Sequence, residues 1–194
     1  QNLGLSDALP FQGVDLWHAY ELSWLDKSGK PVVRVGRFSV PATSPNIVES
    51  KSFKLYLNSL NNSQFSCDED ARGTITTDIS AVAGADVTLR LYAADDPALA
   101  GATLQGECLD ECTIEPRRGE PDAMQLEVQP GNVVEEVLYS HLLRSLCPVT
   151  GQPDWATVWL HYRGSAIMHG SLLQYIVAYR EHQEFHEQCL ERMF

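Results

Sequence analysis

Alternation of apolar and polar residues predicts two paired strands near the start of the chain. Residues 15–26 (DLWHAYELSWLD) and 31–40 (PVVRVGRFSV) both follow the two-residue period of a half-buried strand. The segment between them, 27–30 (KSGK), contains the glycine expected of a turn. The two strands should therefore form a hairpin, with Arg34 and Arg37 as candidate cations near its end.

Helical spacing replaces this alternation in the next part of the chain. Residues 47–60 place apolar side chains on one helical face, and the helix should begin near Glu49. Residues 68–82 predict a second helix, whose acidic first turn suits the positive end of the helix dipole. Strands are expected over 85–92 and 101–108. The first half therefore reads strand, strand, helix, helix, strand, strand.

The same order of elements begins again after a stretch without periodicity. Residues 111–125 are charged and contain prolines, which is typical of a linker between modules. Strands are predicted over 133–146 and 155–162, and helices over 171–180 and 186–194. Because the second copy stops before its last two strands, we expect the polypeptide to be a fragment or to be cut at its last residue.

Composition narrows the possible partners. The formal net charge of −12 argues against nonspecific binding to nucleic acids or anionic membranes, which requires a basic surface. The sequence contains no apolar run approaching the roughly 20 residues of a membrane span, and no signal segment opens it. Its 5 cysteines lack a disulfide-framework spacing. We therefore expect a cytoplasmic protein with reduced thiols.

The most informative stretch is a tight turn that begins at Cys147 and ends at Asp154. Pro148, Gly151 and Pro153 favour a reversal there, which would bring the thiol and the carboxylate to one end of a sheet. Covalent catalysis needs such a nucleophile beside a proton-transfer group. For an isolated pair, however, a half-buried cysteine next to a turn-forming aspartate is the more common arrangement.

Two separated motifs favour the catalytic interpretation of Cys147 and Asp154 over the structural one. One is 49–56 (ESKSFKLY), and the other is the spacing of 147–154, followed by 185–189 (FHEQC). Together they resemble the QueF family of NADPH-dependent 7-cyano-7-deazaguanine reductases, in its two-module form. The resemblance extends over most of residues 11–194 and is weakest over 66–129.

This resemblance implies an α+β fold built from tandem tunnelling-fold modules. The first module would cover residues 11–110 and the second residues 126–194, the latter incomplete at its C-terminus. In that fold, antiparallel sheets carry helices on one face, and sites form where modules or subunits meet. We therefore expect a homodimer whose exposed strand edges are paired on assembly.

The resemblance also assigns catalytic roles. Cys147 would attack the nitrile carbon to give a thioimide, which accepts hydride more readily than a nitrile does. Asp154 would move the proton in that step, and His186 would supply a proton in the later reduction. Glu49 and Glu187 would accept hydrogen bonds from the guanine-like edge of the substrate, 7-cyano-7-deazaguanine.

Further contacts to the substrate and cofactor follow from the same motifs. Phe185 would cover the substrate ring, although burial in the core is an equal alternative. NADPH would be bound by the cations and hydroxyls of the first helix start, which are Ser50, Lys51, Ser52 and Lys54. The sequence contains no Gly-x-Gly-x-x-Gly motif, so a Rossmann site is not expected. No metal ion is assigned.

Other functions compete with this reading. His182, His186 and Cys189 have a spacing that could place three zinc ligands on one helix face, as in a related cyclohydrolase of the tunnelling fold. A non-catalytic module that only binds a purine-like base is a second alternative. Separately from these rival functions, Glu49 has an alternative role as a helix-dipole partner, and Lys51 and Lys54 have an alternative as a solvated face.

Overall fold

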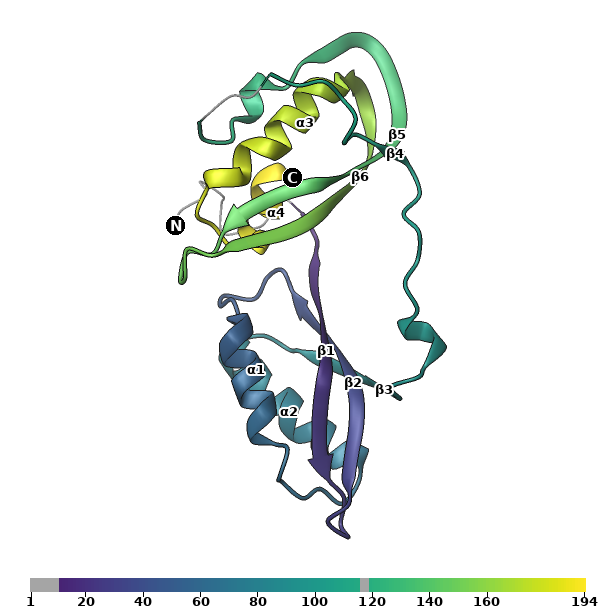
Figure 1. The fold of residues 1–194 in the computed structure, drawn as a ribbon, viewed down its shortest axis with the longest axis vertical. Coiled ribbons are helices and arrows are strands. Elements are labelled where there is room, and N and C mark those ends of the chain that lie inside the picture. The colour runs from purple at the N-terminus through teal and green to yellow at the C-terminus, as the bar shows by residue number, and fades with distance from the viewer. Residues whose placement is uncertain (1–10, 116–118) are drawn as a thin grey trace. The chain divides into compact units, whose positions relative to one another are not determined.

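The computed structural model describes residues 11–115 and 119–194. The protein is mixed α+β and divides into two compact units, Gln1–Gly101 and Ala102–Phe194 (Figure 1). Each unit has a three-stranded sheet with helices packed against it. In the parts of the chain that the structure describes, the search found no helix with both the length and the apolar character needed to cross a membrane.

Unit 1 is a three-stranded antiparallel sheet, in the order β1-β2-β3, covered by two helices. Its elements are β1 (Val14–Leu25), β2 (Pro31–Pro41), α1 (Ser50–Ser59), α2 (Asp68–Ala83), β3 (Thr88–Tyr92) and the 3-10 turn η1 (Pro97–Leu99). The predicted hairpin is confirmed, because β1 and β2 pair through the expected turn. Asp26 closes this turn by accepting the backbone N–H groups of Ser28 and Lys30, and Gly29 adopts a φ of 82°.

The helical spacing read from the sequence produces the core of unit 1. Phe53 and Leu57 of α1 are buried, as are Ile75 and Ile79 of α2, and all four pack in one cluster with residues of the sheet. Phe38 of β2 is fully buried in the same cluster and lies edge-to-face against Phe53, with ring centroids 4.8 Å apart. The predicted apolar face of α1 is therefore confirmed at Phe53 and Leu57, although Leu55 is 70% exposed, and the predicted helix over 68–82 is present as α2.

Neither predicted cation of the hairpin is left without a partner. Arg34 Nε lies 2.8 Å from Asp68 Oδ2 in the first turn of α2, and the Arg37 guanidinium lies over the ring of Tyr92 at 5.6 Å. Both arginines therefore help to hold unit 1 together.

Unit 2 is built on one long, bent hairpin. Its elements are β4 (Glu107–Cys108), η2 (Ala123–Gln125), β5 (Val128–Leu146), β6 (Pro153–Ile167), α3 (His169–Ala178), η3 (Tyr179–Glu181) and α4 (His186–Met193). The sheet order is β4-β5-β6. Strands β5 and β6 pair antiparallel with two irregularities in register, between Gln129 and Val133 and between Ser140 and Leu143. Both strands extend beyond their predicted bounds.

The strand expected over residues 101–108 is wrong in length and in partner. Only Glu107–Cys108 is a strand, and it pairs parallel with β5 in the second sheet. The preceding segment is held to the same sheet, because Trp159 Nε1 donates to the carbonyl oxygen of Gln105 at 3.0 Å. Pairing with a distant strand leaves no trace in local alternation, so the sequence pattern did not indicate it.

The expected linker also contributes to unit 2. Cys112 and Ile114 pack against its core, which is formed by α3, β5 and Leu109. The described residues 111–115 and 119–125 are therefore part of this unit, and residues 116–118 of the expected linker lie outside the described residues.

Candidate active site

The turn between β5 and β6 places Cys147 and Asp154 at one end of the second sheet. Cys147 N–H donates to the carbonyl of Gln152, and Gly151 N–H donates to the carbonyl of Cys147, both at 2.8 Å. Gly151 takes the left-handed conformation that this closure requires, with a φ of 67°. Asp154 lies opposite Ser145 in the strand register, so it emerges beside the strand end that leads into Cys147. The turn therefore has the form that the sequence predicts.

The environment of the Cys147 thiol favours its ionised form. Hydrogen bonds from the Thr150 hydroxyl, and then from the backbone N–H groups of Thr150 and Val149, lower the pKa of the Cys147 thiol. The Asp154 carboxylate acts in the opposite direction through its negative charge, a smaller effect on the pKa. Cys147 is 6% exposed. The residue is therefore buried, and a lowered thiol pKa is typical of a cysteine that acts as a nucleophile.

His186 reaches the same turn from the start of α4. Its Nε2 lies 3.2 Å from the backbone carbonyl oxygen of Asp154. A carbonyl oxygen only accepts hydrogen bonds, so this contact requires a proton on Nε2. The structure thus brings together the three predicted catalytic residues, Cys147, Asp154 and His186, within unit 2.

The segment before α4 is attached directly to the end of β5. Leu146 N–H donates to the carbonyl of His182 at 2.9 Å, and Glu184 N–H donates to the carbonyl of Leu146 at 3.1 Å. Ser145 Oγ adds a bond to the carbonyl of Glu184 at 3.1 Å. These three bonds fix the start of α4 relative to the cysteine turn, and so determine where His186 lies.

A buried carboxylate supports this attachment. Glu184 is 0% exposed and accepts two bonds from Arg192, Nη2 to Oε1 at 2.8 Å and Nε to Oε2 at 3.1 Å. The ring of His182 bridges Glu184, at 3.0 Å from Nε2, and Glu120. Burial alone would raise the pKa of Glu184, but the bonds from Arg192 and His182 hold it below its ordinary value. Sequence reasoning missed Glu184, because a glutamate in a short stretch of polar residues, 181–184, indicates a surface position.

Phe185 and Glu187 flank His186 and are both half-buried. Phe185 is the N-cap of α4, and its carbonyl accepts the N–H of Cys189 at 3.0 Å. Glu187 lies in the first turn of the helix. Two of the three residues predicted to contact the substrate, Phe185 and Glu187, therefore lie next to His186, the predicted proton donor.

The alternative zinc site is not supported. His182 is directed to two carboxylates and His186 to the carbonyl of Asp154. Cys189 is fully buried, and burial raises the pKa of its thiol to about 11. Because these three side chains take separate partners, their regular spacing in sequence does not make them a ligand set.

In unit 1, Glu49 is the N-cap of α1. Its Oε1 accepts the N–H of Lys51 at 2.8 Å, and its Oε2 accepts the N–H and the hydroxyl of Ser52, both at 2.7 Å. The Lys51 N–H bond, followed by the two Ser52 bonds, lowers the pKa of Glu49 to about 2. The helix-start role that the sequence left as an alternative is therefore present, and contact with substrate stays a prediction for this residue.

A groove of about 620 Å³ runs along the predicted cofactor residues of unit 1. Ser50 and Lys54 line it, and Lys54 Nζ pairs with Glu21 at 2.7 Å. Lys51 is exposed, while Ser52 is bound to the cap. Aromatic and polar side chains of β1 and α1 complete the lining, which includes Trp17, His18, Tyr20, Phe53, Asn58 and Asn61. The groove thus offers rings and an ammonium group together.

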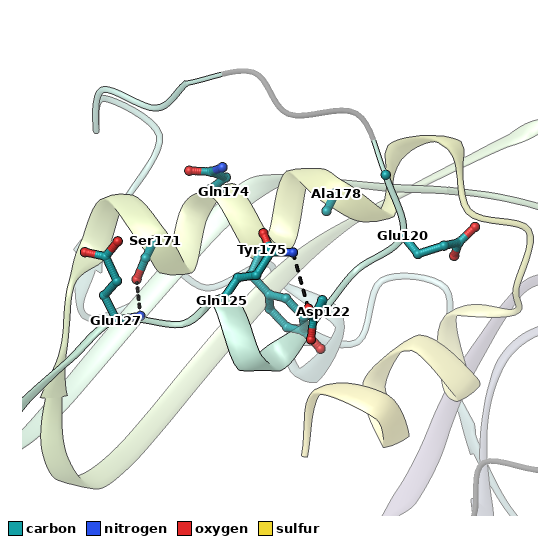
Figure 2. A pocket seen from close by; sticks show the side chains of 9 residues that line it. Glu120, Asp122, Gln125, Glu127, Ser171, Gln174, Tyr175 and Ala178 are labelled. Carbon is teal, nitrogen blue, oxygen red and sulfur yellow. Dashed lines mark hydrogen bonds between the residues drawn. The ribbon is translucent and has the colours of Figure 1, made fainter.

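A second pocket, of about 220 Å³, lies in unit 2 beside α3 (Figure 2). Its rim is held by a bond from Glu127 N–H to Ser171 Oγ at 3.0 Å. The lining residues are Gly119, Glu120, Asp122, Gln125, Glu127, Ser171, Gln174, Tyr175 and Ala178. Three of its described lining residues, Glu120, Asp122 and Glu127, carry carboxylates.

Comparison with known proteins relates this geometry to a family. Residues 1–91 match the family model described as nitrile reductase, 7-cyano-7-deazaguanine-reductase N-term, and residues 153–194 match one described as QueF-like protein. The NADPH-dependent 7-cyano-7-deazaguanine reductase of Chromohalobacter salexigens is 51% identical over 193 residues, and that of Dechloromonas aromatica 55% over 194. Each alignment covers 99% of this chain and 69% of the relative. The chain belongs to the QueF family of nitrile reductases.

Proposed function

We propose that this protein reduces the nitrile of 7-cyano-7-deazaguanine to an aminomethyl group with NADPH as hydride donor, a step toward the modified nucleoside queuosine. One observation carries the proposal: a cysteine thiol of lowered pKa begins a tight turn that ends at Asp154, and His186 contacts that turn from the start of α4. The names of the two relatives state the same activity for those proteins.

Covalent capture is the first step of the proposed mechanism. Asp154 accepts the thiol proton of Cys147, and the sulfur forms a bond to the nitrile carbon. One π bond of the nitrile breaks, and its nitrogen takes the proton back from Asp154, giving a thioimide on Cys147. Sulfur suits this role because the thiolate is strongly nucleophilic at neutral pH. The bonds from Thr150 and Val149 raise the thiolate fraction before substrate arrives.

The two reductive steps return the enzyme to its starting state. Bound NADPH would supply the hydride for each of the two reductions, at the thioimide carbon and then at the imine carbon. Between them the carbon–sulfur bond breaks, and Cys147 leaves as a thiolate when the nitrogen lone pair forms the imine. His186, acting as an imidazolium, delivers a proton to the nitrogen in the second reduction, a role that fits its position beside Asp154. Two hydrides and two protons, one from the Cys147 thiol and one from His186, convert nitrile to amine, and protons from solvent then restore both side chains.

We propose that carboxylates hold the guanine-like edge of the substrate. Glu187 begins α4 next to His186, and it is half-buried, which favours a two-point contact with adjacent N–H donors. Phe185 would cover the ring from the same segment. Glu49 is a further proposed substrate contact, although its oxygens already cap α1.

Consumption of cofactor tests the function directly. With substrate in excess, the protein should oxidise two NADPH for each nitrile consumed and release an amine, measured by NADPH absorbance and by product mass. Binding of substrate without NADPH oxidation would instead favour the non-catalytic purine-binding module. Oxidation of only one NADPH for each product would contradict the two-step mechanism.

Lysines of the first motif should contribute to NADPH affinity. We propose that Ser50, Lys51, Ser52 and Lys54 contact the cofactor. Lys51→Ala and Lys54→Ala should each weaken NADPH binding about ten- to a hundredfold, because a hydrogen bond to a charged group contributes about 1.5–3 kcal/mol. Titration of NADPH into each variant measures this effect. Lys27→Ala is the matched control, since it removes the same charge from an exposed turn. Unchanged affinity in both motif variants would show that these lysines are only a solvated face.

We further propose that the two units correspond to tandem tunnelling-fold modules and that the protein assembles as a cytoplasmic homodimer. Several apolar side chains of the first sheet are exposed, including Leu16 at 55%, Tyr20 at 64% and Val33 at 53%. Such a surface is typical of a sheet that packs against another subunit. Light scattering of the protein should give twice the monomer mass. An active monomer would refute this assembly.

A further inference from the structure

Three potential metal ligands converge in unit 2, on residues that the proposed reaction does not use. One ligand atom each from Cys108, Asp110 and His141 lies within 4.8 Å of the others. Cys108 ends β4, Asp110 follows it by two residues, and His141 lies in β5. The group therefore bridges β4 and β5, which pair in parallel.

The neighbours of these side chains orient them as the neighbours of metal ligands do. His141 Nδ1 lies 2.8 Å from Thr157 Oγ1, which leaves Nε2 for a metal. Asp110 Oδ1 accepts the hydroxyl of Ser140 at 2.7 Å and the N–H of His141 at 3.2 Å. Metal-binding histidines usually form a bond at their second nitrogen, and metal-binding carboxylates are usually hydrogen-bonded as well.

The backbone that carries the group is held in place by the protein alone. His141 lies in the register irregularity between Ser140 and Leu143, and bulges of this kind redirect a side chain. Leu109, between the other two ligands, is 1% exposed, and its N–H donates to the carbonyl of Tyr139 at 2.9 Å. A site fixed in this way needs little reorganisation on binding.

We propose that Cys108, Asp110 and His141 bind one divalent transition-metal ion of the zinc class. A thiolate and an imidazole together favour zinc over magnesium or calcium, which prefer oxygen ligands. Zinc bonds of about 2.0–2.3 Å need ligand atoms roughly 3.5 Å apart in a tetrahedron. Because the ligand atoms already lie within 4.8 Å of one another, they must approach by at most about 1.3 Å. The thiolate and the carboxylate neutralise the two charges of the ion, and a water molecule completes the tetrahedron. The bound ion would cross-link β4 to β5 through its coordination bonds.

Asp110 has a simpler possible role, because it already binds the N–H of His141 and the hydroxyl of Ser140 at the bulge. That role requires no ligand atom from His141 or Cys108. The two roles therefore predict different results when the imidazole of His141 or its contact with Thr157 is removed.

Titration with cobalt and zinc ions distinguishes the two roles. The protein carries Cys147→Ala in these measurements, so that the thiol of the turn cannot bind the ion. One Co²⁺ for each chain should produce a thiolate-to-cobalt charge-transfer band, which Zn²⁺ should displace. Zn²⁺ should also raise the unfolding temperature. His141→Ala and Cys108→Ser should each lose the cobalt band, and Thr157→Val should weaken Zn²⁺ binding about 10–100-fold.

His161→Ala is the matched control, because His161 is an exposed histidine of the same sheet that contacts Glu135 at 3.1 Å. It should bind Zn²⁺ as tightly as the parent does. Far-ultraviolet circular dichroism identifies any variant that does not fold, and Thr157→Val then provides the decisive comparison. Equal Zn²⁺ affinity in the parent and in Thr157→Val would overturn the proposed metal site, and so would a folded parent that binds no Zn²⁺. Asp110 would then only hold the bulge through its bonds to His141 and Ser140.

Discussion

Replacing Cys147 by alanine should abolish both capture of the nitrile and NADPH turnover. The parent protein, incubated with 7-cyano-7-deazaguanine alone, should gain the full mass of one substrate molecule and acquire a near-ultraviolet thioimide absorbance. The alanine variant has no sulfur to form this bond, so its turnover should fall on the order of a thousandfold or more. Intact-mass spectrometry and the NADPH assay measure the two effects.

Two controls make the result specific to Cys147. Cys67→Ala removes an exposed cysteine from unit 1 and should leave the adduct unchanged. Asp154→Asn keeps the size of the side chain but cannot exchange a proton, so it should slow adduct formation while the sulfur remains. An adduct of the same mass on Cys147→Ala would place the nucleophile at another cysteine and contradict the mechanism.

The parts of the fold that the sequence predicted depend on local periodicity. The strands β1 and β2 alternate because one face of their sheet packs on α1 and α2, and the helices repeat their apolar residues for the same reason. The turn at Cys147 was predictable as well, since Gly151 and the flanking prolines determine a short reversal without help from the rest of the chain.

The parts that the sequence did not predict depend on contacts between distant segments. Strand β4 is two residues long, too short to show alternation, and it is defined by pairing with β5. Glu184 is buried because Arg192 and His182 reach it in three dimensions. The proximity of His186 to Asp154 follows from the bonds between residues 182–184 and the end of β5. Motif resemblance supplied the role of His186, which periodicity alone could not have indicated.

Loss of the Glu184 carboxylate should destabilise unit 2 strongly. Glu184→Ala would leave the Arg192 guanidinium without its partner, and removing one member of a buried ion pair costs about 3–5 kcal/mol. The Arg192 side chain is 34% exposed, so water offsets part of that loss. We therefore expect a decrease in the free energy of unfolding of about 3 kcal/mol, at the lower end of that range. Urea denaturation measures it, with Glu181→Ala, at an exposed neighbouring position, as the control.

Low pH should reproduce part of this loss of stability in the unmodified protein, because it neutralises the Glu184 carboxylate. The pKa of Glu184 lies below its ordinary value in the folded protein, so its contribution to stability is present above the unfolded pKa and is lost as pH falls through the folded pKa. Glu184→Ala should therefore lose less stability than the parent between neutral and acidic pH.

A double-mutant cycle tests whether the loss of stability in Glu184→Ala comes from the broken ion pair with Arg192. Removing both charges leaves neither one uncompensated, so Glu184→Ala combined with Arg192→Ala should cost less than the sum of the single changes. Because residues 182–184 also connect the end of β5 to α4, the single Glu184 variant should lose activity at temperatures where it is still folded. Additive stability losses with undiminished turnover would mean that the carboxylate neither pairs with Arg192 nor positions His186.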